Sequence, residues 1–433
     1  MAKAKDWQLS GWLLIGFLVG AGLGMLVRSL GLDQGPLLFI AKMCGEVFLR
    51  GILMLILPLI VPMLLLGVQK LTQTGAMGKI GIATLFTVLG LTGIAAKIGL
   101  LLANLIQPGQ MLSPEARQSL IQRFGTASPA GKSLSSELFL NLIPKNPFYD
   151  IATAFTPQQQ GGLLAVVSFT LLLGLALARL PSEQTNSFYQ ALNILYQASQ
   201  WLLMQIMRWI APIGVAGLIF QAVVGLGGEL FLLLGLYALT VIIGLLLHGG
   251  GIYTLFLRYF SRCSPWQVLR QSSPALLIAF SSASSNATLP TTLKVAIERL
   301  HLYPPVAQFI LTLGATVNQN GTALYEGVTL LFLMQVFGVP LSWGEQILIV
   351  GLAMLIAIGA AGVPGGSLPL LAGVLPQFGV PAAAIALIYG IDRFLDMMRT
   401  TLNVYGDLVI ATYLNRLYYG SPADPTTTQN MAQ

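Results

Sequence analysis

The sequence has few charged residues and few of the side chains that enzymes most often use. Only 9% of its 433 residues are Asp, Glu, Lys or Arg, against about 25% in soluble domains. It contains two cysteines, Cys44 and Cys263, and two histidines, His248 and His301. These residues are spread along the chain, which argues against a disulfide framework or a Cys/His metal site. No nucleophile–base pair is visible, so the sequence does not predict an enzyme.

Long apolar runs fill most of the remaining chain. Hydrophobic residues make up 55% of it, and the mean hydropathy is +0.78. Runs such as "GILMLILPLIVPMLLLGV" and "LFLLLGLYALTVIIGLLL" recur from end to end. About 20 consecutive apolar residues are enough to cross a bilayer as a helix. The sequence therefore predicts an all-α protein that crosses the membrane many times and is surrounded by membrane lipids.

The net charge of +7 is less informative than its placement. One set of short loops, together with the helix ends beside them, carries basic residues. These are Lys70, Lys79, Arg179, Arg258, Arg262, Arg270, Arg299 and Arg416. The connections near 226–229, 337–345 and 376–380 hold no Lys or Arg. Because Lys and Arg concentrate on the cytoplasmic side, we expect an inner (plasma) membrane protein with both termini in the cytoplasm. Their position along loop edges, rather than on one face, does not favour a nucleic-acid partner.

Two apolar segments are interrupted by polar, helix-breaking stretches that resemble each other. One reads "SSASSNATLP" (281–290) and the other "AAGVPGGSLP" (360–369). Leu289 precedes Asn318 by 29 residues, and Leu368 precedes Asp396 by 28, so each tip is followed by a polar cluster at the same spacing. Irregular backbone survives at membrane depth only inside protein or beside a watery cavity. Paired broken segments of this kind indicate a transporter binding site.

The last apolar helix carries a stripe of polar residues. At 100° per residue they fall within about 80° of one another, whereas Arg393 points away from them. The stripe consists of Asp392, Asp396, Arg399, Asn403 and Asp407, with Thr400 beside it. Ionisable residues inside a membrane are costly and indicate function. An internal ion-pair network is the alternative, but three carboxylates exceed what one arginine can pair.

A second polar cluster lies in "GATVNQNGTALYEG". Asn318, Thr322 and Glu326 step by four and share a helix face. The run "NQNG" predicts a break in that helix, where freed carbonyls can coordinate a cation. Glu326 has no cationic partner nearby in the sequence, so it is a candidate proton carrier, although it can also simply face a water pocket.

Lys97 is another charged residue within an apolar segment. Its side chain either snorkels to the membrane surface or provides an ammonium in place of a bound cation.

With these motifs in view, the chain resembles the glutamate/aspartate transporter family, the dicarboxylate/amino acid:cation symporters. The resemblance rests on the tip "SSASSNATLP", on "NQNGT" where the family has Asn-Met-Asp-Gly-Thr, on the tip "GVPGG" and on "DMMRTTLNVYGD". It covers nearly the whole chain. It implies eight transmembrane helices, two re-entrant helical hairpins, inverted repeats and a homotrimer.

The resemblance also implies an elevator mechanism, in which a transport domain slides against a scaffold. The scaffold would comprise residues 1–78 (helices 1 and 2) and, after an extracellular loop, helices 4 and 5 within 107–225. The transport domain would comprise helix 3 at 79–106 and the segment 226–416, with helix 6, hairpin 1, helix 7, hairpin 2 and helix 8. Residues 417–433 are predicted to be a disordered tail.

The family's substrate contacts are implied position by position. Asp396 would pair with the α-ammonium of an amino acid, and Arg399 would hold a side-chain carboxylate through its planar fork. Family members for dicarboxylates typically lack that aspartate, and neutral-amino-acid members lack that arginine. The other implied contacts are Ser284, Ser285, Thr322, Val363, Thr400 and Asn403.

The cation sites are where the sequence departs from the family. One sodium site is implied at Asp407, Asn318, Asn403 and the Gly314 carbonyl. A third site needs an aspartate where this chain has Asn320, and it needs polar residues where the chain has Val88 and Leu91. Without these oxygen donors we expect that site to be lost. Glu326 stands where eukaryotic members carry a glutamate linked to proton cotransport.

The sequence therefore predicts a symporter that imports glutamate or aspartate with protons, a reduced number of sodium ions, or both, and that needs no cofactor. The alternatives are a C4-dicarboxylate:cation symporter and a transporter with an associated anion conductance. Neither the preferred substrate, which differs between the two candidates by one methylene, nor the stoichiometry follows from the sequence.

Overall fold

A computed structural model describes residues 2–31, 35–72, 78–124, 143–153, 162–360 and 366–420. Within these ranges the chain forms helices joined by short connections and contains no β-strand, as predicted. Five helical segments in them are long and apolar enough to cross a membrane. These are Gly11–Ser29, Gly35–Gln69, Lys79–Met111, Ser182–Leu226 and Glu229–Tyr259. Other apolar helices are shorter, so the expected total of eight spans and two hairpins stays a prediction.

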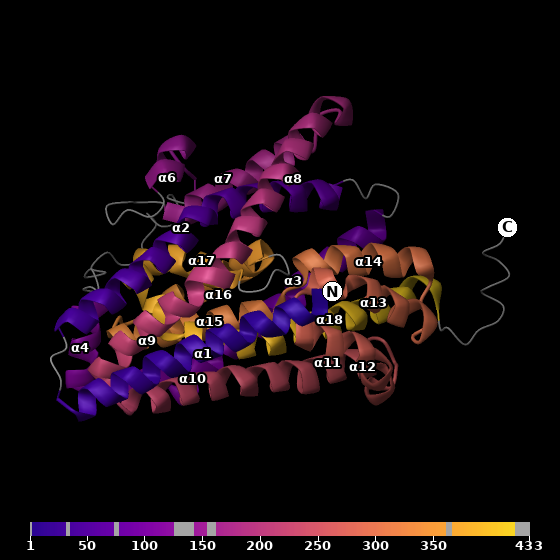
Figure 1. The fold of residues 1–433 in the computed structure, drawn as a ribbon. Helices are drawn as coiled ribbons and strands as arrows, with labels where there is room; N and C mark the ends of the chain where they lie inside the picture. The colour runs from indigo at the N-terminus through magenta and orange to yellow at the C-terminus, as the bar shows by residue number, and fades with distance from the viewer. Residues whose placement is uncertain are drawn as a thin grey trace.

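The first half of the chain is built mainly from long helices (Figure 1). In chain order they are α1 (Ala2–Ser29), α2 (Gly35–Thr72), α3 (Gly78–Ile106), the 3-10 turn η2 (Pro108–Met111), α4 (Pro114–Phe124), α6 (Pro147–Thr153), α7 (Gly162–Leu177), α8 (Ser182–Gln205) and α9 (Ala211–Leu226). A π-helical turn, Ile206–Ile210, joins α8 to α9 without a break. The predicted extracellular region 107–150 is partly helical, because it contains η2, α4 and the start of α6.

The second half contains shorter and more interrupted helices. They are α10 (Glu229–Leu246), α11 (Tyr253–Tyr259), α12 (Pro265–Ser282), α13 (Ser285–Glu298), α14 (Pro304–Val317), α15 (Asn320–Phe337), α16 (Trp343–Ala360), α17 (Ser367–Val374) and α18 (Tyr389–Tyr419). A π-helical turn joins α10 to α11, and two 3-10 turns, Leu375–Phe378 and Ala382–Leu387, lie between α17 and α18. Because α18 extends to Tyr419, the predicted tail cannot begin at residue 417; residues 421–433 lie outside the described ranges.

Helix ends follow the residues that favour them. Pro265 and Pro304 open α12 and α14, where a missing N–H costs nothing. Gly338 ends α15 with φ +71°, and the Val339 N–H then donates to the Met334 carbonyl at 2.9 Å. This is a Schellman cap, which suits glycine because it has no Cβ. The predicted break in "NQNG" is confirmed, since α14 ends at Val317 and α15 begins at Asn320.

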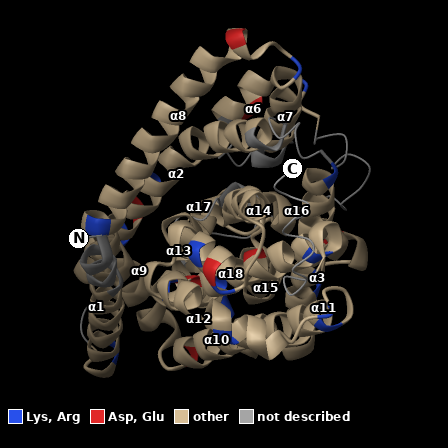
Figure 2. Cartoon of the chain, turned by 90° about the vertical axis from the view of Figure 1, so that its right-hand side faces the viewer, with Lys and Arg blue, Asp and Glu red and all other residues tan. Residues whose placement is uncertain are grey.

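The helices pack in two sets (Figure 2). Helices α1, α2, α7, α8 and α9 contact one another along one side of the molecule. In the other set, α3, α10, α12, α13, α14, α16 and α17 lie around α15 and α18. Every residue of α15 except Gln335 is buried. A helix that is covered on all sides belongs at the centre of a bundle, and this one carries the "NGT" part of the polar motif into that centre.

Helices α1 and α9 approach each other at backbone distance. Gly16, Gly20 and Gly24 recur every four residues on α1, and a Cβ atom on Gly16 or Gly20 would collide with the carbonyl oxygen of Pro212 or Ala216 on α9. Glycines at this spacing let two membrane helices meet without intervening side chains. Residues without side chains therefore set the distance between these two helices.

Candidate functional site

The polar stripe of α18 faces the interior, as predicted. Its members are between 1% and 7% exposed: Asp392, Asp396, Arg399, Asn403 and Asp407. Thr400, predicted beside the stripe, is also buried. The stripe lies against α15, α12 and α14, which pack around α18. Charged and polar groups are thus held inside the helix bundle, where each needs a partner because burying an unpaired charge is costly.

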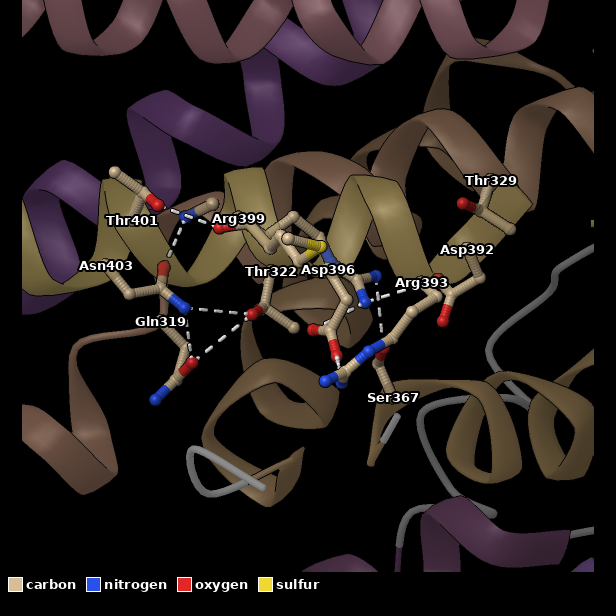
Figure 3. Close-up of polar contacts among 12 residues, drawn as sticks. Gln319, Thr322, Thr329, Ser367, Asp392, Arg393, Asp396, Arg399, Thr401 and Asn403 are labelled. Atoms are coloured by element: carbon tan, nitrogen blue, oxygen red, sulfur yellow. Dashed lines mark hydrogen bonds and ion pairs between the residues drawn. The ribbon is translucent and has the colours of Figure 1, made fainter. Parts of the chain in front are cut away.

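Arg399 is at the centre of the charged part of the site (Figure 3). Its Nη2 lies 2.9 Å from Asp396 Oδ1 and 3.2 Å from Asp392 Oδ1. Its guanidinium carbon is 3.7 Å from the centre of the Tyr325 ring on α15, which is a cation–π contact. Two carboxylates and an aromatic face therefore fix the position of this arginine, and the predicted closeness of Arg399 and Asp396 is confirmed.

The position expected for Arg393 is wrong. The helix angles place it away from the stripe, but its Nη1 lies 3.6 Å from Asp396 Oδ2, and both side chains are about one-tenth exposed. A long side chain can bend back along the helix surface, so an angle at the Cα does not fix where its charge ends up. Asp396 consequently lies between two arginines, Arg393 and Arg399 (Figure 3).

The second interrupted segment also reaches Arg399. Ser367, the first residue of α17, accepts a hydrogen bond from Arg399 Nη1 through its Oγ at 3.2 Å. Val363 was expected to contribute a backbone contact from this tip, but residues 361–365 lie outside the described ranges. The start of α17 therefore brings at least one hydroxyl group to the arginine.

Asn403 connects α18 to the break before α15 (Figure 3). Its Nδ2 donates to Gln319 Oε1 at 2.6 Å and to Thr322 Oγ1 at 3.1 Å, and its Oδ1 accepts the Gly321 N–H at 2.7 Å. The Thr322 hydroxyl in turn donates to Gln319 Oε1 at 3.2 Å. Thr322 and Asn403, both predicted substrate contacts, are brought together. The network also holds the irregular backbone of the break in place.

The predicted sodium ligands meet next to this network. Asn318 Nδ2 donates to Asp407 Oδ1 at 2.8 Å and to the Asn403 carbonyl at 3.3 Å. Gly314 packs against the same carboxylate, because a Cβ atom there would lie 2.9 Å from Asp407 Cγ. The buried Asn318 Oδ1 has no hydrogen-bond donor among the described residues. The Asp407 carboxylate, the Asn403 carbonyl and the amide oxygen of Asn318, which has no donor, are the kind of oxygen ligands that suit a hard cation.

The expected third cation site contains a neutral hydrogen-bond network instead. Asn320 Oδ1 accepts from Thr92 Oγ1 at 2.5 Å, and its Nδ2 donates to the Tyr253 hydroxyl at 2.7 Å. Val88 and Leu91 are buried on α3, and their side chains contain no oxygen. Both ends of the Asn320 amide are therefore engaged by protein groups, which agrees with the expectation that this site is lost.

Glu326 is fully buried on α15, one turn beyond Thr322. Neither of its carboxylate oxygens has a hydrogen-bond partner among the described residues. No ion pair in the described ranges includes it. Lys97 is exposed on α3, so it does not occupy a buried cation site.

The serine-rich tip forms the turn between α12 and α13. Ala283 has φ +50°, and Ser284 caps α13, with its Oγ accepting the Ala287 N–H at 3.2 Å. Ser285 is 2% exposed, and its hydroxyl has no partner among the described residues. Of the two predicted tip contacts, Ser284 is thus used to start a helix, while Ser285 keeps an unused hydroxyl in the interior.

Three residues of the site were not singled out as substrate-site residues from the sequence. Tyr325 and Ser367 contact Arg399 from other helices, and Gln319 bridges Asn403 and Thr322. The "NQNG" run pointed to Gln319 as a polar residue, and Ser367 follows the second tip directly. Nothing in the sequence distinguishes Tyr325 from the other tyrosines.

The sequence is similar to those of several known membrane transporters. The proton/sodium-glutamate symport protein of Bacillus caldotenax is 29% identical, and the alignment covers 92% of each chain. Excitatory amino acid transporter 2 of Rattus norvegicus is 28% identical over 91% of this chain and 76% of its own. Neutral amino acid transporter A of Homo sapiens is 32% identical over 93% of this chain and 80% of its own. The model of the sodium:dicarboxylate symporter family matches residues 9–417, and the chain belongs to this family.

Proposed function

We propose that the protein is a secondary-active symporter of acidic amino acids. The observation that carries this proposal is the buried Arg399, held between carboxylates and the Tyr325 ring at the centre of the bundle. A guanidinium in this position can bind a substrate side-chain carboxylate with two parallel hydrogen bonds. Asp396 lies next to it and can accept the substrate ammonium. A neutral amino acid has no side-chain carboxylate for Arg399 to bind.

The charges of the site indicate why substrate should move together with cations. Asp392 and Asp396 balance Arg393 and Arg399, so this group is neutral as a whole. An acidic amino acid would add one negative charge to it. Carrying that charge through the bilayer uncompensated is unfavourable, by about 2.3 kcal/mol per 100 mV of opposing membrane potential. Cotransported cations remove this penalty.

Two further carboxylates are available to take up those cations. Asp407 shares its site with Asn318 and the Gly314 segment, which suits sodium. Glu326 has no partner among the described residues, which suits a proton, since protonation breaks no existing contact there. We therefore expect at least one sodium ion and one proton to accompany each substrate molecule.

The two helix sets support an elevator movement as the means of transport. All polar site residues described above lie on α3, α10–α11 and α12 to α18, and none lies on α1, α2, α7, α8 or α9. In this proposal the set around α15 and α18 moves as the transport domain, and the set of α1, α2, α7, α8 and α9 is the scaffold, assembled as a homotrimer in the plasma membrane.

Uptake into proteoliposomes tests the proposal directly. Labelled aspartate and glutamate should accumulate when an inward sodium gradient or an inward proton gradient is imposed alone, and more strongly when both are imposed. Unlabelled alanine and serine should compete weakly. Full competition by succinate or malate, which have no ammonium group for Asp396, would instead indicate a dicarboxylate symporter. Accumulation without either gradient would contradict symport.

Replacement of Glu326 by glutamine tests the proton pathway. The amide has nearly the same shape but cannot carry a proton, so the variant should transport substrate with little dependence on external pH. Uptake measured across the neutral pH range checks this. Glu298→Gln is the matched control, because Glu298 is an exposed residue whose carboxylate, within the described part of the chain, forms an ion pair only with Lys294 at 3.9 Å. A Glu326→Gln variant with the pH profile of the unaltered protein would remove Glu326 from this role.

A further inference from the structure

A polar cavity lies near the C-terminal end of α18, away from the substrate residues. It has a volume of about 460 Å³ and is bounded by the start of α12, the connection between α13 and α14, and the last turns of α18. Arg262, Arg299 and Arg416 line it, together with His301. No aspartate or glutamate is among its lining residues. The cavity is therefore a concentrated site of positive charge.

The arginines of this cavity are not neutralised within the described part of the chain. None of the three takes part in an ion pair there. Arg416 is oriented by hydrogen bonds from its Nη1 to the Arg262 carbonyl at 3.1 Å and to Cys263 Sγ at 3.4 Å. These bonds use one of its three guanidinium nitrogens. A guanidinium that is fixed in place and still has donors free is prepared to bind an anion.

The backbone around the cavity is also unusual. Arg262 and His301 have φ values of +49° and +53°, in the left-handed region that favours glycine. A residue with a Cβ is less stable there by about 1–2 kcal/mol. Both residues follow the end of a helix, where glycine would serve as the cap. Strained positions of this kind tend to occur where the side chain has a use.

The cavity lies at the edge of a membrane-crossing segment. The apolar segment Glu229–Tyr259 ends three residues before Arg262. Large aromatic side chains within four residues of Arg262 in the sequence are exposed: Tyr259 by 71%, Phe260 by 66% and Trp266 by 72%. Aromatic residues of this kind gather at the level of lipid headgroups. The three arginines are therefore at the depth where lipid phosphates lie.

We propose that this cavity binds the phosphate group of an anionic phospholipid. Three arginines supply the charge, and uncharged donors such as Gln267, Gln271 and Asn415 also line the space. Basic pockets between membrane helices are suited to such headgroups. The exposed aromatic residues favour a lipid over a soluble phosphate, because they place the entrance within the bilayer surface. A bound lipid would connect α12, the link between α13 and α14, and α18, and α18 also carries polar residues of the substrate site.

Binding of phosphatidylglycerol tests the proposal on the full-length protein. Native mass spectrometry, with phosphatidylglycerol or phosphatidylcholine added to the detergent-solubilised protein, should show retention of the anionic lipid. The double variant Arg262→Gln/Arg299→Gln should bind it about tenfold or more weakly. These two residues are exposed, so the variant should fold. The melting temperature in phosphatidylcholine vesicles checks folding, and that in vesicles with phosphatidylglycerol should rise for the unaltered protein but not for this double variant.

The matched control is Arg258→Gln/Arg270→Gln. It removes the same two charges from exposed positions near the same membrane edge that do not line the cavity. The proposal requires this control to retain the lipid. Equal losses in the two double variants would show general surface attraction and overturn the site. Displacement of the lipid by inorganic phosphate at similar concentration would overturn the assignment to a lipid, as would equal retention of phosphatidylcholine.

Discussion

Replacement of Arg399 by alanine should reduce uptake of aspartate and glutamate about 100-fold or more. Arg399 is 1% exposed and is paired with Asp392 and Asp396. Truncating one partner of a buried, hydrogen-bonded charge pair weakens binding by about 2–5 kcal/mol, and every 1.4 kcal/mol is a factor of ten. The substrate carboxylate would lose its partner and would meet Asp392 without its arginine and Asp396 still paired with Arg393. Uptake of neutral amino acids has no such requirement and should be kept or gained.

Proteoliposome uptake of labelled aspartate and labelled serine, measured side by side, separates these effects. Arg399→Lys is an informative second variant, since it keeps the charge but not the planar fork, and it should recover only part of the aspartate uptake. Arg270→Ala, at an exposed position on α12, controls for expression and charge. Equal aspartate uptake before and after the Arg399→Ala change would reject the assignment of this residue to the substrate carboxylate.

Replacement of Gly314 by alanine should disrupt the sodium site. The added Cβ atom would collide with Asp407 Oδ1 and lie 2.9 Å from Asp407 Cγ, so the carboxylate would have to move from its position beside Asn318. Cation sites depend on the positions of their oxygen ligands. We expect the sodium concentration needed for half-maximal uptake to rise about tenfold or more. Aspartate uptake measured over a series of sodium concentrations checks this.

Two other glycines provide matched controls for this substitution. A Cβ atom on Gly235 of α10 or Gly351 of α16 would meet no heavy atom within 4 Å. Alanine favours a helix over glycine by about 1 kcal/mol, so both control variants should fold and keep the sodium dependence of the unaltered protein. If Gly314→Ala also keeps it, Asp407 does not hold the coupling ion.

The predictable parts of the site were those set by local geometry. A helix turns by a fixed angle, so the spacing of Asp396, Arg399 and Asn403 was sufficient to place them on one buried face. The break at Asn318 followed from consecutive polar residues in an apolar segment. Arg393 was misplaced because the same angle describes the Cα position and not the reach of a long side chain.

Contacts between distant segments could not be predicted in this way. Thr92 and Asn320 are separated by 228 positions and share a hydrogen bond, and Ser367 meets Arg399 across 32. Which residues of two helices meet depends on how far each helix shifts and rotates when it packs, and a single sequence does not contain that information. The family resemblance pointed to Asn320 but not to Tyr253, the residue that completes its hydrogen bonds.

The glycines at positions 16, 20 and 24 constrain which parts of the molecule can shift during a transport cycle. Where Gly16 and Gly20 set the backbone of α1 directly against that of α9, the two helices cannot slide past each other without separating first, because no side chain lies between them at these positions. These two helices should therefore keep their relative position and behave as one rigid unit throughout the transport cycle. Any sliding must therefore occur between helices whose contacts are formed by larger side chains. A cross-link between α1 and α9 should leave the transport rate unchanged.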